Sequence, residues 1–181
     1  MTRDDFASMF QASWRRLWCI AIAVVHDRGA AEDVLQEAAL VAMGKLDQFK
    51  EGTSFTAWMG QIVRYVALNQ ARSRQRRRTA SDDGLGGRGM TPPAPPSPLT
   101  SDGSLRPEQA SFDDSLVRAL RGLDPTASAC LLLRSVEGLS YREIARSLEI
   151  PEGTAMSHVH RSRAALRESL RGATAPRREG S

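Results

Sequence analysis

Two short segments near the C-terminus combine polar and basic side chains at helical spacing. Residues 140–166 read SYREIARSLEIPEGTAMSHVHRSRAAL, which predicts two helices separated by a turn at residues 149–151. Ser140 and Glu143 are spaced as in a capping box, and Pro151 suits the first turn of a helix. In a helix-turn-helix the second helix enters the major groove, with base contacts near its N-terminal end and phosphate contacts around it. A plain helical hairpin has the same spacing, so both interpretations stay open at this point.

The second helix would separate apolar from polar side chains. Its inward face is predicted to consist of Ala155, Val159 and Leu166. Its outward face is expected to carry Met156, Ser157, His158, His160, Arg161 and Arg163. For the arginines, an ordinary solvated face is the alternative to DNA contact. His158 and His160 are two apart, so one helix cannot direct both at one metal ion. We expect no metal, no cofactor and, because no nucleophile–base pair is present, no enzyme activity.

A second basic segment lies in the first half of the chain. No Asp or Glu occurs between Gly52 and Thr79. Six arginines occur there, namely Arg64, Arg72, Arg74, Arg76, Arg77 and Arg78. Together with the net charge of +4, this segment favours an anionic partner.

Residues 79–111 divide the chain. They hold six of the nine prolines and five of the fourteen glycines and have little to bury, which is typical of a flexible linker. The division predicts an N-terminal module at 1–78, a C-terminal module at 112–172 and a disordered tail at 173–181. Apolar residues recur at helical spacing in both modules, and no run alternates with period two. The expected fold class is therefore all-α, with two small helical domains joined by the linker.

Three helices are predicted in the N-terminal module. The first runs through Val25, the second covers about residues 30–46, and the third covers about residues 55–74 after a loop at 47–54. In the C-terminal module, residues 128–136 predict a helix that packs against the hinged pair. Trp58 is more typical of a core residue than of a platform for base stacking.

The two cysteines and the apolar runs indicate an intracellular chain. Cys19 and Cys130 are far apart within apolar runs, which predicts buried, reduced thiols, with an incidental reactive thiol as the alternative. The longest apolar stretch, residues 17–25, is shorter than the roughly 20 residues of a membrane span. The N-terminus has no signal-peptide pattern. We expect a cytoplasmic protein without membrane insertion.

The C-terminal module resembles a known family. LDPTASACLLLRSVEGLSYREIARSLEIPEGTAMSHVHRSRAALRESL, at residues 123–170, is similar to region 4 of bacterial RNA polymerase sigma factors. Two positions differ: Ala155 stands where valine is usual, and His158 stands where a DNA-contacting arginine is usual. The resemblance implies contacts to the −35 promoter element from Tyr141, Arg142, Thr154, Met156, Ser157, His158, Arg161 and Arg163.

The N-terminal module resembles region 2 of the same family. AEDVLQEAAL, at residues 31–40, is similar to a helix with a D-x-x-Q-E signature that docks on the clamp helices of the polymerase's largest subunit. The resemblance implies that Asp33, Gln36 and Glu37 bind core polymerase. A solvated helix face is the alternative.

FTAWMGQIVRYVALNQARSRQRR, at residues 55–77, resembles the segment that opens and reads the −10 element. Tyr65 stands in the usual asparagine place and Asn69 in the usual aspartate place, and no family role is carried over to Tyr65. In the family a flipped base is held by the loop before this helix, here residues 49–56. The implied −10 contacts are Phe49, Lys50, Thr53, Ser54, Phe55, Arg64, Asn69, Arg72, Arg74 and Arg76.

Two modules with no region between them match the extracytoplasmic-function (ECF) group of sigma factors. The resemblance implies a chain that is monomeric when free, binds core RNA polymerase at the clamp helices and flap, recognises promoter DNA and promotes melting. An anti-sigma factor is a further partner that the resemblance suggests. The linker spans at most about 105 Å, enough for elements about 50 to 70 Å apart. The alternative is a stand-alone helix-turn-helix regulator, although neither module has apolar residues to spare for a dimer interface or effector pocket.

Overall fold

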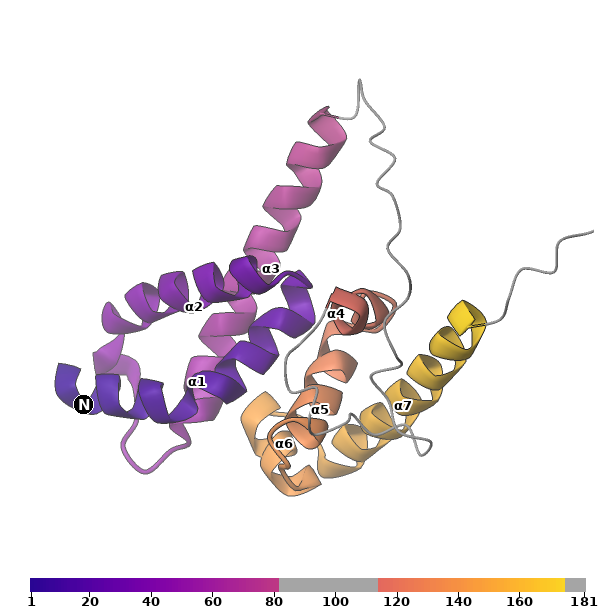
Figure 1. Cartoon of the computed structure of the whole chain (residues 1–181). Coiled ribbons are helices and arrows are strands. Elements are labelled where there is room, and N and C mark those ends of the chain that lie inside the picture. The colour runs from indigo at the N-terminus through magenta and orange to yellow at the C-terminus, as the bar shows by residue number, and fades with distance from the viewer. Residues whose placement is uncertain (82–113, 175–181) are drawn as a thin grey trace, which may run out of the picture.

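The computed structural model describes residues 1–81 and 114–174, with side chains at 1–77 and 117–168. Within these ranges every regular element is a helix (Figure 1). The N-terminal module contains α1 (Arg3–Val25), α2 (Arg28–Met43), the 3-10 helix η1 (Leu46–Gln48) and α3 (Phe55–Ser81). The C-terminal module contains α4 (Asp114–Leu120), α5 (Pro125–Ser135), α6 (Tyr141–Leu148) and α7 (Glu152–Thr174). The all-α prediction is confirmed. Most of the predicted linker and tail, and the Arg78 side chain, lie outside the described parts.

Side-chain caps and one long buried segment explain the N-terminal module. At the start of α1, the Asp5 amide donates to Thr2 Oγ1 and the Thr2 amide donates to the Asp5 carboxylate, which is a capping box. The Ala30 amide donates to Asp27 Oδ1 over 2.7 Å at the start of α2. Nearly all of α1 from Leu17 to Val24 is buried, because α2 and α3 both pack against it.

The C-terminal module is built around α5. Residues 127–133 of α5 are all buried, and α6 and α7 pack against this helix. The inward face predicted for α7 is confirmed: Ala155, Val159 and Leu166 are at most 1% exposed. Ser162 is also buried there, and its hydroxyl donates to the carbonyl of Ala127 over 3.3 Å.

The two modules are docked on one another. α1 contacts α5, and α3 contacts α6 (Figure 1). Arg15 Nε lies 3.1 Å from the Glu137 carboxylate, and Gln61 Nε2 donates to Glu149 Oε2 over 2.8 Å. At Gly60 a Cβ atom would lie 3.3 Å from the carbonyl oxygen of Ser147, so this position favours glycine at the crossing of α3 and α6.

Two predicted helix ends were wrong, and one helix was not predicted. α2 ends at Met43 and η1 follows, so the predicted end at residue 46 was too late. α3 continues to Ser81 because its arginine-rich second half is a good helix former, and it therefore extends into the predicted linker. α4 was not predicted, although Val117 and Leu120 on it are buried, because seven residues are too few to show a clear period.

The prediction for the two cysteines agrees with the structure. Cys19 and Cys130 are free and buried. Burial raises the pKa of Cys130 to about 12 and raises that of Cys19 as well. None of the described helices combines the length and apolarity that crossing a bilayer requires.

Candidate functional site

The predicted polymerase-binding residues form one exposed face of α2. Asp33, Gln36 and Glu37 are all exposed, whereas Val34 and Leu35 between them are fully buried. Glu37 Oε2 accepts a hydrogen bond from Gln70 Nε2 of α3 over 2.7 Å, which fixes the carboxylate at the α2–α3 junction.

An apolar side chain continues this acidic face. Leu40 is 66% exposed, and it follows Asp33 by seven positions and Gln36 by four, so the three share one side of α2. Leu40 was not among the predicted contacts. Its spacing relative to the buried face was the available indication, because a leucine on the polar side of an amphipathic helix has no core to fill.

The loop before α3 rests on a cluster of aromatic rings. Phe49 and Phe55 are each 8% exposed, and their ring centroids are 6.0 Å apart. Trp58 is half-buried, and its ring centroid lies 5.3 Å from that of Phe49 and 5.9 Å from that of Phe55. The ring of Phe6 in α1 packs edge-on against the ring of Phe55, with their centroids 5.8 Å apart. Phe49 and Phe55, predicted as DNA contacts, thus support the loop from inside, and Trp58 packs with them as expected.

The polar residues of the loop form a tight turn. The Thr53 amide and hydroxyl both donate to the Lys50 carbonyl, and Gly52 has φ 82°, where glycine is favoured. Ser54 Oγ accepts from the Ala57 amide and caps α3. Lys50 and Thr53 are exposed, so their side chains form the outer rim of the loop.

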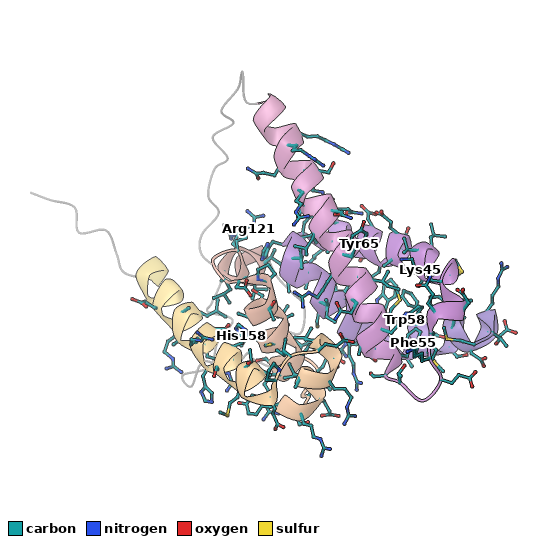
Figure 2. All side chains as sticks on the ribbon, turned by 180° about the vertical axis from the view of Figure 1, so that it is seen from behind. Lys45, Phe55, Trp58, Tyr65, Arg121 and His158 are labelled. Atoms are coloured by element: carbon teal, nitrogen blue, oxygen red, sulfur yellow. The ribbon has the colours of Figure 1, made fainter. Side chains whose placement is uncertain are left out.

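The predicted −10 residues on α3 divide among three directions. Asn69, Arg72 and Arg76 are exposed and fall on one stripe, because four and three residues are each close to a full helical turn. Arg74 is exposed on about the opposite side of the helix. The stripe also contains Tyr65, and Figure 2 shows this residue farther along α3 than Phe55 and Trp58.

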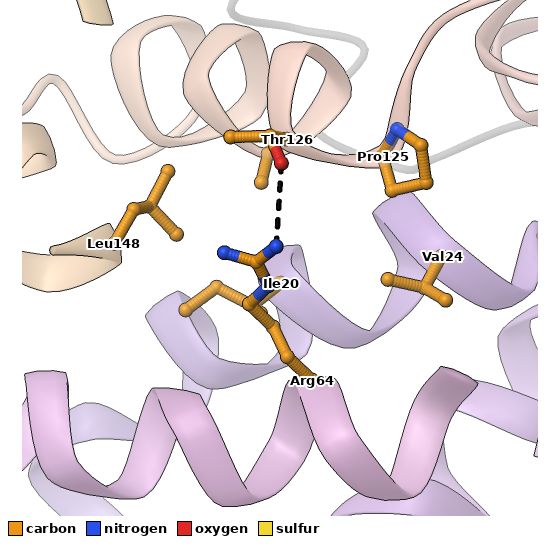
Figure 3. A pocket seen from close by; sticks show the side chains of 7 residues that line it. Ile20, Val24, Arg64, Pro125, Thr126 and Leu148 are labelled. Carbon is orange, nitrogen blue, oxygen red and sulfur yellow. Dashed lines mark hydrogen bonds between the residues drawn. The ribbon is translucent and has the colours of Figure 1, made fainter. Parts of the chain in front are cut away.

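Arg64 points away from the stripe and toward the C-terminal module. Its Nη2 donates to Thr126 Oγ1 of α5 over 3.4 Å (Figure 3). A small cavity between the modules surrounds this contact; its lining residues are Ile20, Val24, Arg64, Pro125, Thr126, Ala129 and Leu148. In this docked arrangement Arg64 bridges the modules and does not share the face of Asn69 and Arg72.

His26 makes a further contact between the modules. It ends α1 in a left-handed conformation, with φ 50°, and its imidazole lies near the backbone of Leu120. Burial, together with the positive charge of Arg121, lowers the pKa of His26. Its Nε2 is buried without a hydrogen-bond partner in the described part of the chain. The neutral imidazole is therefore the form that suits the docked arrangement.

The hinged pair of helices has the predicted caps. The Glu143 amide donates to Ser140 Oγ, and the Ser140 amide donates to Glu143 Oε2. The Ser140 hydroxyl also donates to Glu143 Oε2 over 2.7 Å. This bond and the one from the Ser140 amide lower the pKa of Glu143, because both stabilise the carboxylate. The turn uses Glu149 in the left-handed region, with φ 53°. Pro151 stands just before α7, not in its first turn, and its carbonyl accepts the amides of Thr154 and Ala155.

The outward face of α7 is narrower than predicted. Ser157 and Arg161 lie directly opposite the buried face and are exposed, and His160 lies beside them. Met156 is 45% exposed on one flank, and Thr154 is half-buried. The predicted −35 contacts did not include His160, although its spacing from Ser157 and Arg161 places it on this face.

The remaining residues of the predicted −35 set lie at the edges of that face. His158 and Arg163 are half-buried on opposite flanks of α7, and Arg163 Nε is buried. On α6, Arg142 is exposed, whereas Tyr141 is half-buried with the Arg134 guanidinium 5.1 Å from its ring centroid. Tyr141 therefore packs underneath the helix-turn-helix, and only part of its side chain reaches the outer face.

Comparisons with known proteins agree with this division into modules. The family model for sigma-70 region 2 matches residues 9–77, and the model for sigma-70, region 4 matches residues 113–166. The ECF RNA polymerase sigma-E factor of Escherichia coli is 30% identical over 76% of this chain and 72% of its own length. The chain belongs to the ECF family of RNA polymerase sigma factors. As a sigma factor, it is a transcription initiation factor, and the stand-alone regulator hypothesis is not favoured.

Other relatives support the same family. The ECF RNA polymerase sigma factor SigW of Bacillus subtilis is 26% identical over 93% of this chain and 90% of its own length. The RNA polymerase sigma factor CarQ of Myxococcus xanthus is 30% identical, also over 93% of this chain and 90% of its own length. Among solved structures, the sigma factor RpoE of Bartonella quintana, in complex with the anti-sigma factor NepR, matches 92% of this chain with a TM-score of 0.62 and 27% identity. CnrH, solved with the cytosolic domain of CnrY, shares the fold with a TM-score of 0.62 at 18% identity.

Proposed function

We propose that this sigma factor binds core polymerase through α2, reads the −10 element with α3 and the loop before it, and reads the −35 element with α7. The observation that carries the proposal is the separation of surfaces by charge. Asp33 and Glu37 lie on an acidic face with Leu40, whereas Asn69, Arg72 and Arg76 lie on the basic stripe of α3. A polymerase contact and a phosphate contact thus have distinct places on one module.

The polymerase contact would be made at the clamp helices of the largest subunit, with the flap as a second contact for the C-terminal module. Leu40 would add apolar area at the C-terminal end of the acidic face, which suits a protein partner better than DNA. The DNA contacts would begin at Lys50 and Thr53 and continue along the stripe. In the C-terminal module Ser157, His160 and Arg161 are the outermost side chains available to base edges and phosphates.

The same proposal covers the domain boundaries and the partners. Residues 1–81 would act as the polymerase and −10 module, and residues 114–174 as the −35 module. An anti-sigma factor is a partner by analogy with the Bartonella quintana complex. We infer that the chain is monomeric when free, works in the cytoplasm where it meets polymerase, and catalyses no reaction itself.

Charge reversal on α2 tests the polymerase contact. Asp33→Lys with Glu37→Lys should reduce binding to core polymerase at least tenfold in a pull-down or anisotropy titration, because two attractive contacts become repulsive. Gln70→Ala is the matched control, since it breaks the Gln70–Glu37 hydrogen bond but keeps the carboxylate. Binding retained by the double lysine variant, or lost equally by Gln70→Ala, would contradict the assignment.

A further inference from the structure

Glu149 has a backbone conformation that its residue type disfavours. It is the C-cap of α6, with φ 53° and ψ 47°, and it begins the turn at residues 149–151 that separates α6 from α7. We call this turn the hinge. A residue with a Cβ atom loses free energy in the left-handed region, which glycine enters without strain. At Gly52 and Gly138 the chain meets the same requirement with glycine, so the glutamate at 149 needs another reason.

The side chain of Glu149 reaches the other module. Its Oε2 accepts a hydrogen bond over 2.8 Å from Nε2 of Gln61 in α3, which is 88 residues away in the sequence. His26 is the other described non-glycine residue in the left-handed region. It ends α1, and its imidazole lies near the backbone of Leu120 in the C-terminal module. Both of these left-handed caps thus direct their side chains across the boundary between the modules.

The crossing of α3 and α6 contains a second residue that local structure disfavours. Gly60 lies in the interior of α3, where glycine weakens a helix relative to alanine. A Cβ atom at this position would lie 3.3 Å from the carbonyl oxygen of Ser147, two residues before Glu149. Glycine at position 60 therefore allows the close approach of α3 to the end of α6 that brings Gln61 to Glu149. Local costs that meet at one contact are typical of a functional site.

We propose that docking of the modules holds the hinge of the helix-turn-helix. The hydrogen bond from Gln61 stabilises Glu149 in its left-handed conformation, and the hinge loosens when the modules separate. Because such coupling is reciprocal, a hinge in this conformation also favours docking. The helix-turn-helix is then firm in the docked protein and adaptable in the separated one. The consequence for reading the −35 element rests on the proposed function, whereas the coupling itself does not.

Hydrogen exchange of the full-length protein, without polymerase or DNA, tests the coupling. The Ile150 amide reports on the hinge, because it donates to the Ala145 carbonyl over 3.0 Å. Its exchange rate can be followed by NMR as a measure of local opening. Gln61→Ala removes the donor on α3 and leaves the sequence of the C-terminal module unchanged. Gln70→Ala is the matched control, because Gln70 also lies on α3 and donates to a glutamate, but to Glu37 of its own module.

We expect Gln61→Ala to speed exchange of the Ile150 amide about fivefold, since the net contribution of one hydrogen bond is about 1 kcal/mol. Gln70→Ala should leave this rate unchanged. Glu149→Gly relieves the backbone and removes the carboxylate, so adding Gln61→Ala to it should have no further effect on exchange.

An unchanged rate in Gln61→Ala would overturn the proposal, and so would an equal acceleration by Gln70→Ala. It would also be overturned if Gln61→Ala accelerated exchange equally in the Glu149→Gly background, because the effect would then bypass Glu149. Failure of the proposed function has a separate readout, the absence of promoter-dependent transcription by the holoenzyme, which this exchange experiment does not involve.

Discussion

The docked arrangement of the two modules predicts that weakening their contact will help the protein engage polymerase and promoter DNA. Modules of this size have a radius of gyration of about 11 Å, so the centres of two modules in contact lie roughly 30 Å apart. The promoter elements of the proposed function lie about 50 to 70 Å apart. The modules must therefore separate before both elements can be bound, and Arg64 must leave Thr126.

Glu137 is the best point at which to perturb this contact. Its carboxylate lies 3.1 Å from Arg15 Nε and 4.0 Å from Arg16 Nε, and its side chain is only 13% exposed. The Arg15 side chain is 67% exposed, so solvent screening reduces the pair to about 1 kcal/mol. Glu137→Gln should then shift the docking equilibrium about fivefold toward separated modules. If docking dominates in the free protein, the apparent affinity for polymerase should rise by up to the same factor.

Single-molecule energy transfer can measure this shift directly. Dyes at Ser8→Cys and Glu168→Cys would report the separation of the modules, because both positions are exposed. The native Cys19 and Cys130 are buried with raised pKa values, so they should react slowly with the dyes.

The matched control is the charge swap Arg15→Glu with Glu137→Arg, combined with Arg16→Gln to remove the repulsion from Arg16. It restores an ion pair at the same place and should restore docking. The reasoning would be refuted if Glu137→Gln left the energy-transfer distribution and the polymerase affinity unchanged. It would also be refuted if the charge swap separated the modules as much as Glu137→Gln alone.

Three further predictions follow from individual side chains. Replacing Arg72 and Arg76 by alanine should reduce the salt dependence of promoter binding by the holoenzyme by about one unit of slope per arginine, and an unchanged slope would exclude them as phosphate contacts. Burial lowers the pKa of His26 below its ordinary 6.5, so protonation of His26 as the pH falls from 7 to 5 should weaken docking. Energy transfer should show this weakening in the wild type but not in His26→Asn, because asparagine does not titrate and also tolerates the left-handed cap. Leu166→Ala should cost about 2–5 kcal/mol in urea unfolding because Leu166 is 1% exposed, whereas Met156→Ala, at a 45% exposed position, should stay within about 0.5 kcal/mol of wild type.

Local chemistry explains which parts of the fold could be predicted from the sequence. The Ser140–Glu143 capping box and the inward face of α7 depend on residues within a few turns of each other, so spacing alone predicts them. The exposure of Asp33 and Glu37 follows in the same way from the buried residues between them.

Contacts between distant parts of the chain could not be predicted in this way. Arg64 belongs to the arginine-rich run of α3, yet its partner Thr126 is 62 residues away. The burial of Phe55 depends on Phe6 of α1, which no local pattern associates with the loop. Tyr65 shows the opposite case, because helical spacing alone puts it on the same side of α3 as Arg72, whereas its exposure comes from the structure.

Run-off transcription tests the central conclusion most directly. Purified protein and core polymerase from the same source would be mixed with fragmented genomic DNA, and transcript 5′ ends would be sequenced. We expect new start sites that depend on the protein and share two spaced upstream elements. Absence of such starts, with the same polymerase active under its housekeeping sigma factor, would contradict it.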